Sequence, residues 1–520
     1  MVYFVYETKL YIYSIKEVFS MKRRVLSLLL VFLLAGGMIS CSEQSAGEPE
    51  VPADDPAAPA AENAEPAETE DPYAHLYEDL PTGDFEGRSF TILTPIHAES
   101  DFVGEVDGDV ISEAVYRRNL KVEEDLNVTV VPVSEAGLWD DQANYINKIK
   151  VSVMAADDSY QLISGYAAYI TSIASEGVLA NWNDVADVNF EKPWWNQDIV
   201  YEMDVAGKLF YITGDLSMTS LDYLFCLFFN KNLMNDVGLE LPYDIVKEGA
   251  WTFDRMTSYA ETVSIDMNGD GKMTIDDVYG YASDMTNFVS AYQAAFDADI
   301  TVKDENGLPV LAITEESFID KFSAMYTFLV DSPSVFLAPA ETDYTDDLNR
   351  DVTKLFAEGR ALFEPQLLGN SAALRNVEID FGILPYPKYT EEQSNYMTTA
   401  WDAYNLFCIP LTADLDFVGK ITEYMAAYSF DIVLPAFYDK ALISKYARDT
   451  ESADMIGIIR ESATYNFGQV NSIHCSHCGH IFRELVSAKD PNISSKIAKS
   501  IKPMTKSLER FIEKSYIDVP

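Results

Sequence analysis

One short segment of the sequence has the spacing of oxygen ligands that a hard cation needs. Residues 266–277 read DMNGDGKMTIDD, and a glycine stands at the sixth of these twelve positions. In a twelve-residue calcium loop, side chains at positions 1, 3, 5, 9 and 12 and the backbone carbonyl at position 7 supply six to eight oxygens. The sequence therefore predicts one structural calcium ion. The expected ligands are Asp266, Asn268, Asp270, Lys272 through its carbonyl, Thr274 and Asp277.

The last position of this loop departs from the EF-hand pattern. Asp277 stands where an EF-hand carries Glu. The loop resembles that of dockerin modules, which also end in Asp. Only one such loop is present and it lies inside the chain, so we do not expect a cohesin-docking module. The weaker interpretation is a plain Asp/Gly turn, in which three neighbouring carboxylates would repel one another.

A second cluster of metal-binding residue types lies near the carboxyl end. Residues 474–480 read HCSHCGH and hold two thiols and three imidazoles. Such groups bind zinc, but a closed zinc site needs four ligands, and this chain offers a single CxxC pair. Zinc at Cys475 and Cys478 is therefore the less favoured interpretation, and a local disulfide between them is the alternative. Cys226 and Cys408 lie in apolar runs, where a buried thiol behaves as a small hydrophobe.

The beginning of the chain carries an export signal in residues 21–41. From Met21, basic residues 22–24 precede an apolar run, 25–34, that is too short for a membrane span. The tetrapeptide 38–41 resembles the lipobox of bacterial lipoproteins. The resemblance implies acylation of Cys41, with palmitate among the acyl chains, and an extracytoplasmic protein anchored to the cell membrane by lipid alone. The alternative is an uncleaved anchor helix. Residues 1–20 fit no export logic and are interpreted as an over-extended gene start.

The composition of the remainder sets the number of lobes and excludes some partners. Residues 42–84 contain no Lys or Arg and predict a disordered acidic tether. The chain from 85 onwards is long enough to form two lobes. The formal net charge of the whole chain, −47, argues against nucleic acid and anionic lipid surfaces as partners.

The first part of the folded region predicts alternating strands and helices. We expect strands at 89–95, 127–133 and 160–166 and helices at 110–126 and 143–156. Such alternation indicates an α/β fold with a mainly parallel sheet, in which ligands bind beyond the carboxyl ends of the strands. The pair Gly165 and Tyr166 lies at such an end.

Later segments resemble a known family in their order along the chain. AGKLFYI, FFNKNLM and WTFDRM are followed by EGRALFEPQLLG (358–369), VEIDFGILPYPK (377–388) and TTAWDAYNLFCIP (398–410). Together they resemble the family 1 extracellular solute-binding proteins, the maltose-binding-protein-like substrate-binding lipoproteins of ABC transporters. The resemblance implies an α/β, two-lobed periplasmic-binding-protein type II fold with a multi-strand hinge. We expect one lobe at 85–213 plus 378–425 and the other at 214–377 plus 426–520.

The resemblance also indicates where a sugar would bind. It places sugar-stacking rings at Trp194 and Trp195 and cleft-lining residues around Trp401, because aromatic rings stack on sugar C–H faces and carboxylates accept from hydroxyls. The alternative for each ring is core packing, which we expect for Trp251. The EPQLLG stretch lacks a Trp that sugar-binding relatives often carry, so a peptide or polyamine ligand stays open. The candidate ligand-binding residues are Trp195, Trp194, Trp401, Asp402, Tyr404, Asp215, Tyr223 and Tyr166.

The implied function is capture of a carbohydrate for an ABC importer. We expect a monomer that passes an oligosaccharide to permease subunits and is not an enzyme. The sequence has no phosphate loop, no G-x-S-x-G elbow and no H-E-x-x-H pair. The alternatives are a surface glycan-binding lipoprotein without a permease and an extracytoplasmic carbohydrate-active enzyme.

The calcium loop gives a direct prediction about stability. An ion that binds only the folded chain should stabilise it by about 1.4 kcal/mol at a calcium concentration ten times the Kd. Calcium should therefore raise the melting temperature, EDTA should lower it, and Asp270→Ala should abolish the difference. Melting curves that are identical with and without chelator would contradict the prediction.

Overall fold

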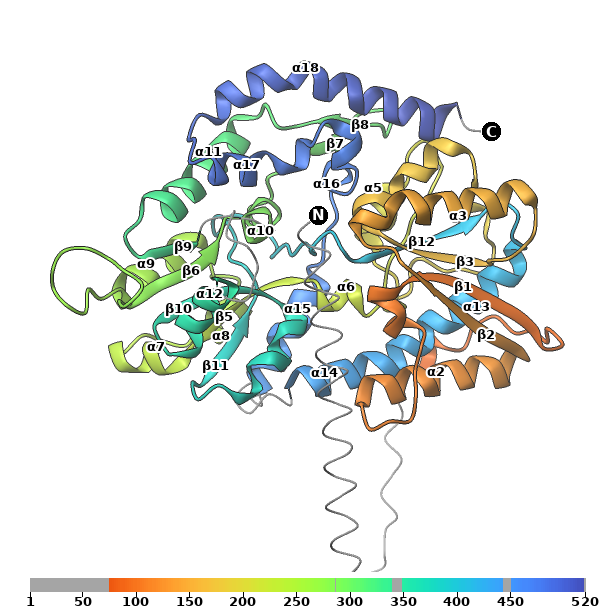
Figure 1. Cartoon of the computed structure of the whole chain (residues 1–520), viewed down its shortest axis with the longest axis horizontal. Coiled ribbons are helices and arrows are strands. Elements are labelled where there is room, and N and C mark those ends of the chain that lie inside the picture. Colours follow the sequence, from red (N-terminus) through yellow and green to blue (C-terminus); the bar gives the residue numbers. More distant parts are fainter. Residues whose placement is uncertain (1–73, 286, 339–347, 443–449, 519–520) are drawn as a thin grey trace, which may run out of the picture. The chain divides into compact units, whose positions relative to one another are not determined.

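Two mixed β-sheets with helices packed on them organise residues 74–285, 287–338, 348–442 and 450–518, which the computed structural model describes (Figure 1). The first sheet has the order β2-β1-β3-β12-β4, and the second has the order β11-β5-β10-β6-β9. We call each sheet with its covering helices the first and the second lobe. The first-lobe strands are β1 (Arg88–Pro95), β2 (Val128–Glu135), β3 (Leu162–Tyr166), β4 (Leu179–Ala180) and β12 (Asn405–Pro410). The second-lobe strands are β5 (Phe225–Asn230), β6 (Tyr279–Asp284), β9 (Val335–Ala338), β10 (Ala361–Leu367) and β11 (Phe381–Leu384), and a separate hairpin pairs β7 (Thr301–Lys303) with β8 (Pro309–Leu311).

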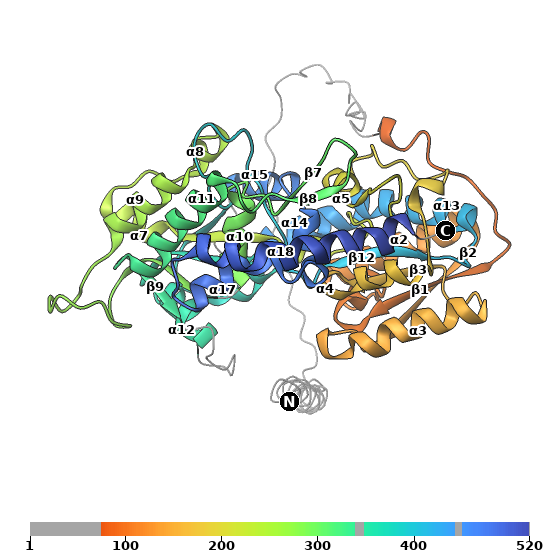
Figure 2. The same cartoon turned by 90° about the horizontal axis from the view of Figure 1, so that it is seen from above.

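Helices pack around both sheets, and the last long helix reaches both lobes. The helix α18 contacts α11 of the second lobe, and the turn that follows it contacts residues 171–176 of the first; Figure 2 shows its course. The helices up to the second sheet are α2 (Val110–Leu126), α3 (Gln142–Ala155), α4 (Ala167–Ile170), α5 (Gln197–Met203), α6 (Thr219–Asp222), α7 (Lys231–Val237), α8 (Tyr243–Lys247) and α9 (Phe253–Val263). The later helices are α10 (Asn287–Ala295), α11 (Glu316–Tyr326), α12 (Leu348–Ala357), α13 (Leu415–Tyr428), α14 (Leu434–Leu442), α15 (Thr450–Glu461), α16 (Phe467–Val470), α17 (Ile481–Ser487) and α18 (Ile493–Ile512). None of the helices within the described ranges is both long and apolar enough to cross a membrane.

The predicted helix at 110–126 forms with the expected bounds, and its end signals explain why. The Asp109 side chain accepts hydrogen bonds from the backbone of Ile111 and Ser112, which caps the amino end. At the other end Asn127 takes the left-handed conformation, with φ of 49°, and stops the helix. The buried face repeats with helical spacing at Ala114, Val115, Val122 and Leu126. The predicted strands β1, β2 and β3 and the helix α3 also form within two residues of their expected bounds.

The prediction of a mainly parallel sheet needs a correction. β1 pairs in parallel with both β2 and β3, but β12 lies antiparallel between β3 and β4. In the second sheet β10 pairs in parallel with β6, while β5 lies antiparallel to β10 and β11. β5 and β12 each follow a segment that comes from the other lobe, so they enter their sheets from the opposite direction. The sheets are therefore mixed within an α/β fold.

The predicted lobe bounds also change. β11 belongs to the second sheet, because it pairs with β5, although we had assigned residues from 378 to the first lobe. The turn at Ser429–Val433 and α14 pack against α2 of the first lobe, although we had assigned residues from 426 to the second. The chain thus returns to the first lobe after β11, later than the predicted residue 378. It stays there through α14, beyond the predicted residue 425.

The predicted tether is shorter than expected at its carboxyl end. Leu76, Tyr77 and Leu80 pack against the core, and the ring of Tyr77 stacks on Trp194 with centroids 6.1 Å apart. Lys192 donates to the carbonyl of Leu76 at 2.8 Å. Residues 74–84 are therefore part of the folded unit. The signal segment, Cys41 and tether residues 42–73 lie outside the described residues.

Three connecting segments join the lobes and bind one another through their backbones. We define them as 214–224, 385–404 and 462–466. A hydrogen bond from Trp401 N to Tyr223 O at 2.8 Å joins the first and the second, and Phe225 N, at the start of β5, donates to Thr399 O of the second at 3.1 Å. Thr398 joins the second to the third, since its N–H donates to Ser462 and its carbonyl accepts from Thr464, both at 2.8 Å. This is the multi-strand hinge that the resemblance implies.

A buried carboxylate fixes two of these segments to the first lobe. Asp101 accepts from the Ser217 hydroxyl at 2.8 Å and from the backbone N–H of Met218 at 2.7 Å. It also accepts from the Asn405 amide at 3.1 Å, where the second segment enters β12. Arg118, itself buried, donates to the backbone carbonyl of Asp101 at 2.7 Å. Asp101 therefore ties the hinge to the end of β1.

Buried carboxyls give a prediction about stability and pH. Burial raises the pKa to about 6 for Asp101 and about 7 for Glu364 and Glu423. Each group then binds its proton more tightly in the folded than in the unfolded chain, where its pKa is about 4. Their stabilisation is fully present below about pH 4 and is lost as the pH rises through 6 to 7. Urea unfolding should therefore give a higher free energy at pH 5.5 than at pH 8.0, by a few kcal/mol at about 1.4 kcal/mol per tenfold change in proton affinity.

Glu364→Gln is the matched control for this prediction. Glu364 Oε1 accepts from the Thr353 hydroxyl at 2.7 Å and the Gln366 amide at 2.8 Å, and an amide oxygen can keep both bonds. The variant cannot titrate, so its unfolding free energy should depend less on pH than that of the parent. An equal pH dependence in both proteins would contradict the assignment for Glu364.

Candidate ligand-binding cleft

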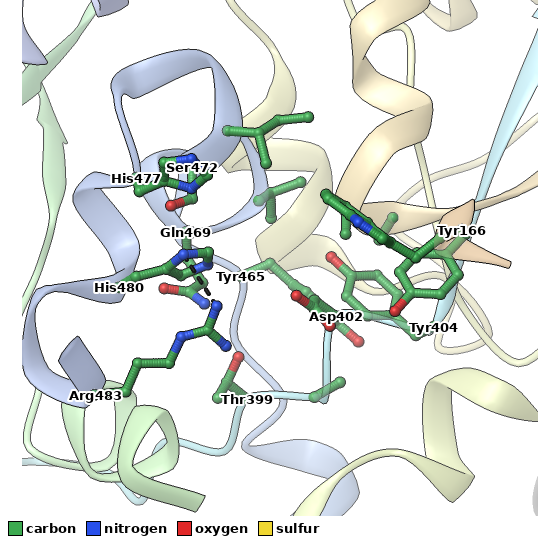
Figure 3. A pocket seen from close by; sticks show the side chains of 16 residues that line it. Tyr166, Thr399, Asp402, Tyr404, Tyr465, Gln469, Ser472, His477, His480 and Arg483 are labelled. Atoms are coloured by element: carbon green, nitrogen blue, oxygen red, sulfur yellow. Dashed lines mark hydrogen bonds between the residues drawn. The ribbon is translucent and has the colours of Figure 1, made fainter. Parts of the chain in front are cut away.

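A cavity of about 260 Å³ lies where the first lobe, the second connecting segment and the chain from α16 to α17 meet (Figure 3). Three of the predicted ligand-binding residues, Tyr166, Asp402 and Tyr404, line it together. The opposite wall comes from residues that the sequence did not indicate as ligand-binding. These are Gln469, Ser472, His477, His480 and Arg483.

The first-lobe wall is built at the carboxyl end of β3, as the strand pattern predicted. Tyr166 is the last residue of β3, and its ring stacks on Tyr169 at 5.4 Å. The backbone N–H of Ala167 donates to the Tyr404 carbonyl at 2.9 Å, and that of Ala168 donates to the Asp402 carbonyl at 3.1 Å. These bonds hold the start of α4 against the second connecting segment, so the strand end and the segment form one surface.

The opposite wall presents imidazole and guanidinium groups. Arg483 donates from Nη2 to Nδ1 of His480 at 3.0 Å, so His480 carries its proton on Nε2 when neutral. Burial, Arg483 and His477 together lower the pKa of His480 to about 3. His480 is therefore neutral at physiological pH. Figure 3 shows His480 and Arg483 on the side of the cavity opposite Tyr166 and Asp402.

Two polar side chains of the first-lobe wall, Asp402 and Tyr404, are largely buried without full compensation by hydrogen bonds or charge. Burial raises the pKa of Asp402, and the nearby positive charge of Arg483 offsets part of this. The Tyr404 hydroxyl is buried and has no hydrogen-bond partner within the described ranges. A buried hydroxyl without a partner is costly unless a ligand or water completes it. The cavity thus offers both donors and acceptors to a polar guest.

Trp139 is the exposed ring of this cavity, and the sequence analysis missed it. It lines the cavity with 45% of its surface exposed. It stands in the short turn Trp139–Asp141 between β2 and α3. The available signal was a large apolar residue in an acidic loop that follows a strand. A ring in such a position offers a face to a ligand.

A second cavity of about 380 Å³ lies beside the first and third connecting segments, and Tyr465 lines both cavities. Trp194, Trp195 and Asp215 line it, together with Arg460. Arg460 binds Asp215 with both nitrogens, at 2.6 Å from Nη2 to Oδ2 and 3.2 Å from Nε to Oδ1. This ion pair uses one acceptor position on each oxygen of Asp215, and the expectation that Asp215 also accepts from sugar hydroxyls stays a prediction.

Trp194 and Trp195 belong to the core of the first lobe, contrary to the prediction that they stack on a sugar. Trp194 is fully buried and Trp195 is 3% exposed. Both indoles donate to Glu423 of α13, at 3.1 Å and 2.7 Å. Tyr77 stacks on Trp194, Phe190 packs edge to face with Trp195, and at this burial neither indole offers a free face to a ligand in this conformation. Trp251 is fully buried, as expected for packing.

Trp401 and Tyr223 lie on the connecting segments and not in either cavity. Their rings pack edge to face with centroids 5.3 Å apart, and their backbones are hydrogen-bonded. Trp401, expected to line the cleft, therefore lines neither of these two cavities in this conformation. Asp402 lines the 260 Å³ cavity while the adjacent Trp401 does not, because the chain forms a turn from Trp401 to Tyr404.

The predicted calcium loop folds its side chains onto its own backbone. The Asp266 carboxylate accepts from Gly269 N at 2.8 Å and Gly271 N at 2.7 Å. The Asp277 carboxylate accepts from Met267 N at 2.9 Å and Thr274 N at 2.6 Å, which lowers its pKa. In the described part of the chain no three His, Cys, Asp or Glu side chains lie close enough to hold a metal ion. Neither calcium binding in this loop nor zinc binding at 474–480 is tested by these contacts. Calcium binding stays a prediction.

Known structures resemble this arrangement, although no family model and no curated protein sequence matches the chain. A cyclo/maltodextrin-binding protein complexed with maltotetraose superposes with a TM-score of 0.53 at 12% identity, over 82% of this chain and 98% of that one. A sugar transporter from Rhizobium etli in an open conformation gives 0.53 at 11% identity, over 81% and 99%. UspC from M. tuberculosis gives 0.52 at 11% identity, over 81% and 100%.

The chain has the α/β fold of this maltodextrin-binding protein and this sugar transporter. At these identities the likeness concerns the fold alone, and the resemblance found in the sequence is confirmed at that level. In the solute-binding-protein fold described here, the 260 Å³ cavity lies between the lobes and beside the hinge.

Proposed function

We propose that this protein captures a carbohydrate in the 260 Å³ cavity and delivers it to an ABC importer. The observation that carries the proposal is that the walls of this cavity combine an aromatic ring with polar side chains. One half-exposed ring, Trp139, lines a space that the side chains of Asp402, His480 and Arg483 also line. Stacking surface with converging donors and acceptors is what a sugar ring requires.

The charges in the cavity favour an uncharged ligand. The guanidinium of Arg483 and the carboxylate of Asp402 lie near enough for Arg483 to offset the effect of burial on Asp402. His480 adds no charge, because its pKa is lowered to about 3. The fixed charges therefore cancel, although the whole chain has a net charge of −47. A neutral oligosaccharide fits this balance better than a polyamine.

The proposed membrane anchor and permease partners are supported by the fold and by the amino-terminal segment of the sequence. We propose that Cys41 is acylated and anchors the protein to the extracytoplasmic face of the membrane, where it works as a monomer beside the permease subunits. No catalytic step is proposed. The support is the lipobox-like 38–41 segment together with a fold shared with a maltodextrin-binding protein and a sugar transporter.

We also propose that the loop 266–277 binds one structural calcium ion. Its support is the ligand spacing, since the acceptor oxygens that now bind backbone N–H groups come from the predicted ligand positions. Asp304→Ala is a matched control for Asp270→Ala. Asp304 also accepts from nearby backbone N–H groups in an exposed turn, but its segment lacks the twelve-residue spacing. Asp304→Ala should therefore keep the response to EDTA.

The ring of Trp139 gives the test of the carbohydrate proposal. Calorimetry with maltotetraose and related malto-oligosaccharides should show binding to the wild-type protein. Trp139→Ala should lose roughly 2 kcal/mol if the ring is a binding hot spot, which is about thirtyfold in affinity. Its melting temperature should hardly change, because the ring is half exposed.

Tyr201→Ala is the control for this substitution. Tyr201 is also an exposed ring on the first lobe, 61% exposed, but it lines neither cavity. Its removal should leave the affinity unchanged. Equal affinity in Trp139→Ala and the parent would show that the cavity is not the binding site. A wild-type protein that binds no neutral oligosaccharide of the series would contradict the proposed function.

A further inference from the structure

Two buried cysteines lie in the segment that carries one wall of the cleft. Cys475 ends the turn Ser472–Cys475, and Cys478 begins the turn Cys478–His480. Both side chains are fully buried, and Cys478 is near enough to Cys475 to help raise the pKa of its thiol. Cys478 also donates to the carbonyl of Gly468 at 3.4 Å. The other two described cysteines, Cys226 in β5 and Cys408 in β12, lie in different sheets.

The backbone between the two thiols is held in an unfavourable conformation. Ser476 has φ of 55° and His477 has φ of 59°, so two successive residues with side chains are left-handed. Each such residue costs free energy relative to the right-handed form. The two left-handed residues are the whole of the chain between Cys475 and Cys478. A covalent link between them would hold this turn without further help from packing.

The same turn carries side chains of the candidate cleft. His477 and His480 flank Cys478 and line the cavity, as Figure 3 shows. Ser472, which also lines the cavity, accepts at its hydroxyl from the backbone N–H of Gly479 at 3.1 Å. A change at the cysteine pair is therefore transmitted to the cleft wall over one or two residues.

We propose that Cys475 and Cys478 form a disulfide in the exported protein, and that this bond holds His477 and His480 in the cleft wall. The inference rests on the proposed function, because only a chain outside the cytoplasm folds in an oxidising compartment. The reaction is an exchange with a disulfide-bearing oxidant, either a protein or a small molecule. One cysteine sulfur attacks the oxidant and releases its first thiol. The second cysteine sulfur attacks the mixed disulfide and releases the other thiol, so two protons and two electrons pass to the oxidant.

The timing of this reaction follows from burial. Contact with Cys478 and burial raise the pKa of Cys475, so the folded protein keeps it as an unreactive thiol. Both sulfurs are also closed to a bulky oxidant. The bond therefore forms before this segment packs, and in the folded protein it resists mild reductants.

Peptide mapping of the full chain tests the bond. The protein is purified without reductant from cells that export it, denatured with EDTA and treated with a thiol-alkylating reagent. Cys226 and Cys408 should be alkylated, while Cys475 and Cys478 should be alkylated only after reduction. A zinc site would release both thiols to the reagent without reductant. Alkylation of Cys475 and Cys478 before reduction would overturn the proposal.

Binding of maltotetraose tests the effect on the cleft. The double variant Cys475→Ser, Cys478→Ser should bind several-fold more weakly than the parent and melt a few degrees lower. The matched control, Cys226→Ala, removes a buried sulfur away from the cavity and should keep the parental affinity. Equal affinity in the double variant would overturn the role of the bond in the cleft. If no form binds maltotetraose but the mapping shows the bond, the proposed function fails while the disulfide stands.

Discussion

Both backbone groups of Thr398 bind the third connecting segment, and its neighbours bind the first. The rest of the structure depends on this short region of paired backbone. It joins the two sheets, whose buried side chains belong to one hydrophobic cluster, through a few connecting residues. Hinge motion in such folds is concentrated in a few connecting residues. The candidate cleft lies directly beside this region, because Thr399 and Ala400 of the second segment line the cavity. A change in the angle between the lobes would therefore change the cavity first.

Buried carboxylates secure the ends of this hinge. Asp101 holds the first and second segments at the end of β1, and Asp215 pairs with Arg460 beside the third. Glu423 accepts from the indoles of Trp194 and Trp195, and the Trp194 carbonyl accepts from Asp215 N of the first segment at 2.9 Å. Burying an acid is costly unless hydrogen bonds or a partner charge compensate it. In a chain with 84 acidic and 37 basic residues, most such partners here are neutral N–H and O–H groups, which leaves the pKa values raised.

The sequence predicted local elements well because their signals are local. The helix 110–126 has its own cap and its own apolar face, and the strand ending at Tyr166 correctly located one wall of the cleft. Positions set by long-range packing were harder. Trp194 and Trp195 lie near carboxylates in the sequence, but a helix 230 residues away supplies the acid that binds them and covers them. Nothing near residue 194 could show this.

Other site residues were missed for a related reason. His477 and His480 stand beside two cysteines, so the pattern favoured a metal or a disulfide, and their place in the cleft depends on how the carboxyl-terminal segment returns between the lobes. Trp139 had a visible signal in its acidic loop, but exposure of a ring is a property of the folded surface. The predicted lobe boundary was wrong at β11. The sequence of an apolar strand does not show which strand it pairs with, and β11 pairs with β5 of the second sheet.

The most direct test of the account is the distance between the lobes with and without a ligand. Spin labels can be attached to cysteines substituted at Glu124 on α2 and Glu261 on α9, both exposed, while the natural cysteines from 226 onwards are buried. Pulsed electron paramagnetic resonance would give the distance distribution between these labels. The account predicts a shift to shorter distances when maltotetraose saturates the protein, as the lobes close around the 260 Å³ cavity. A distribution that stays the same while maltotetraose binds would contradict it.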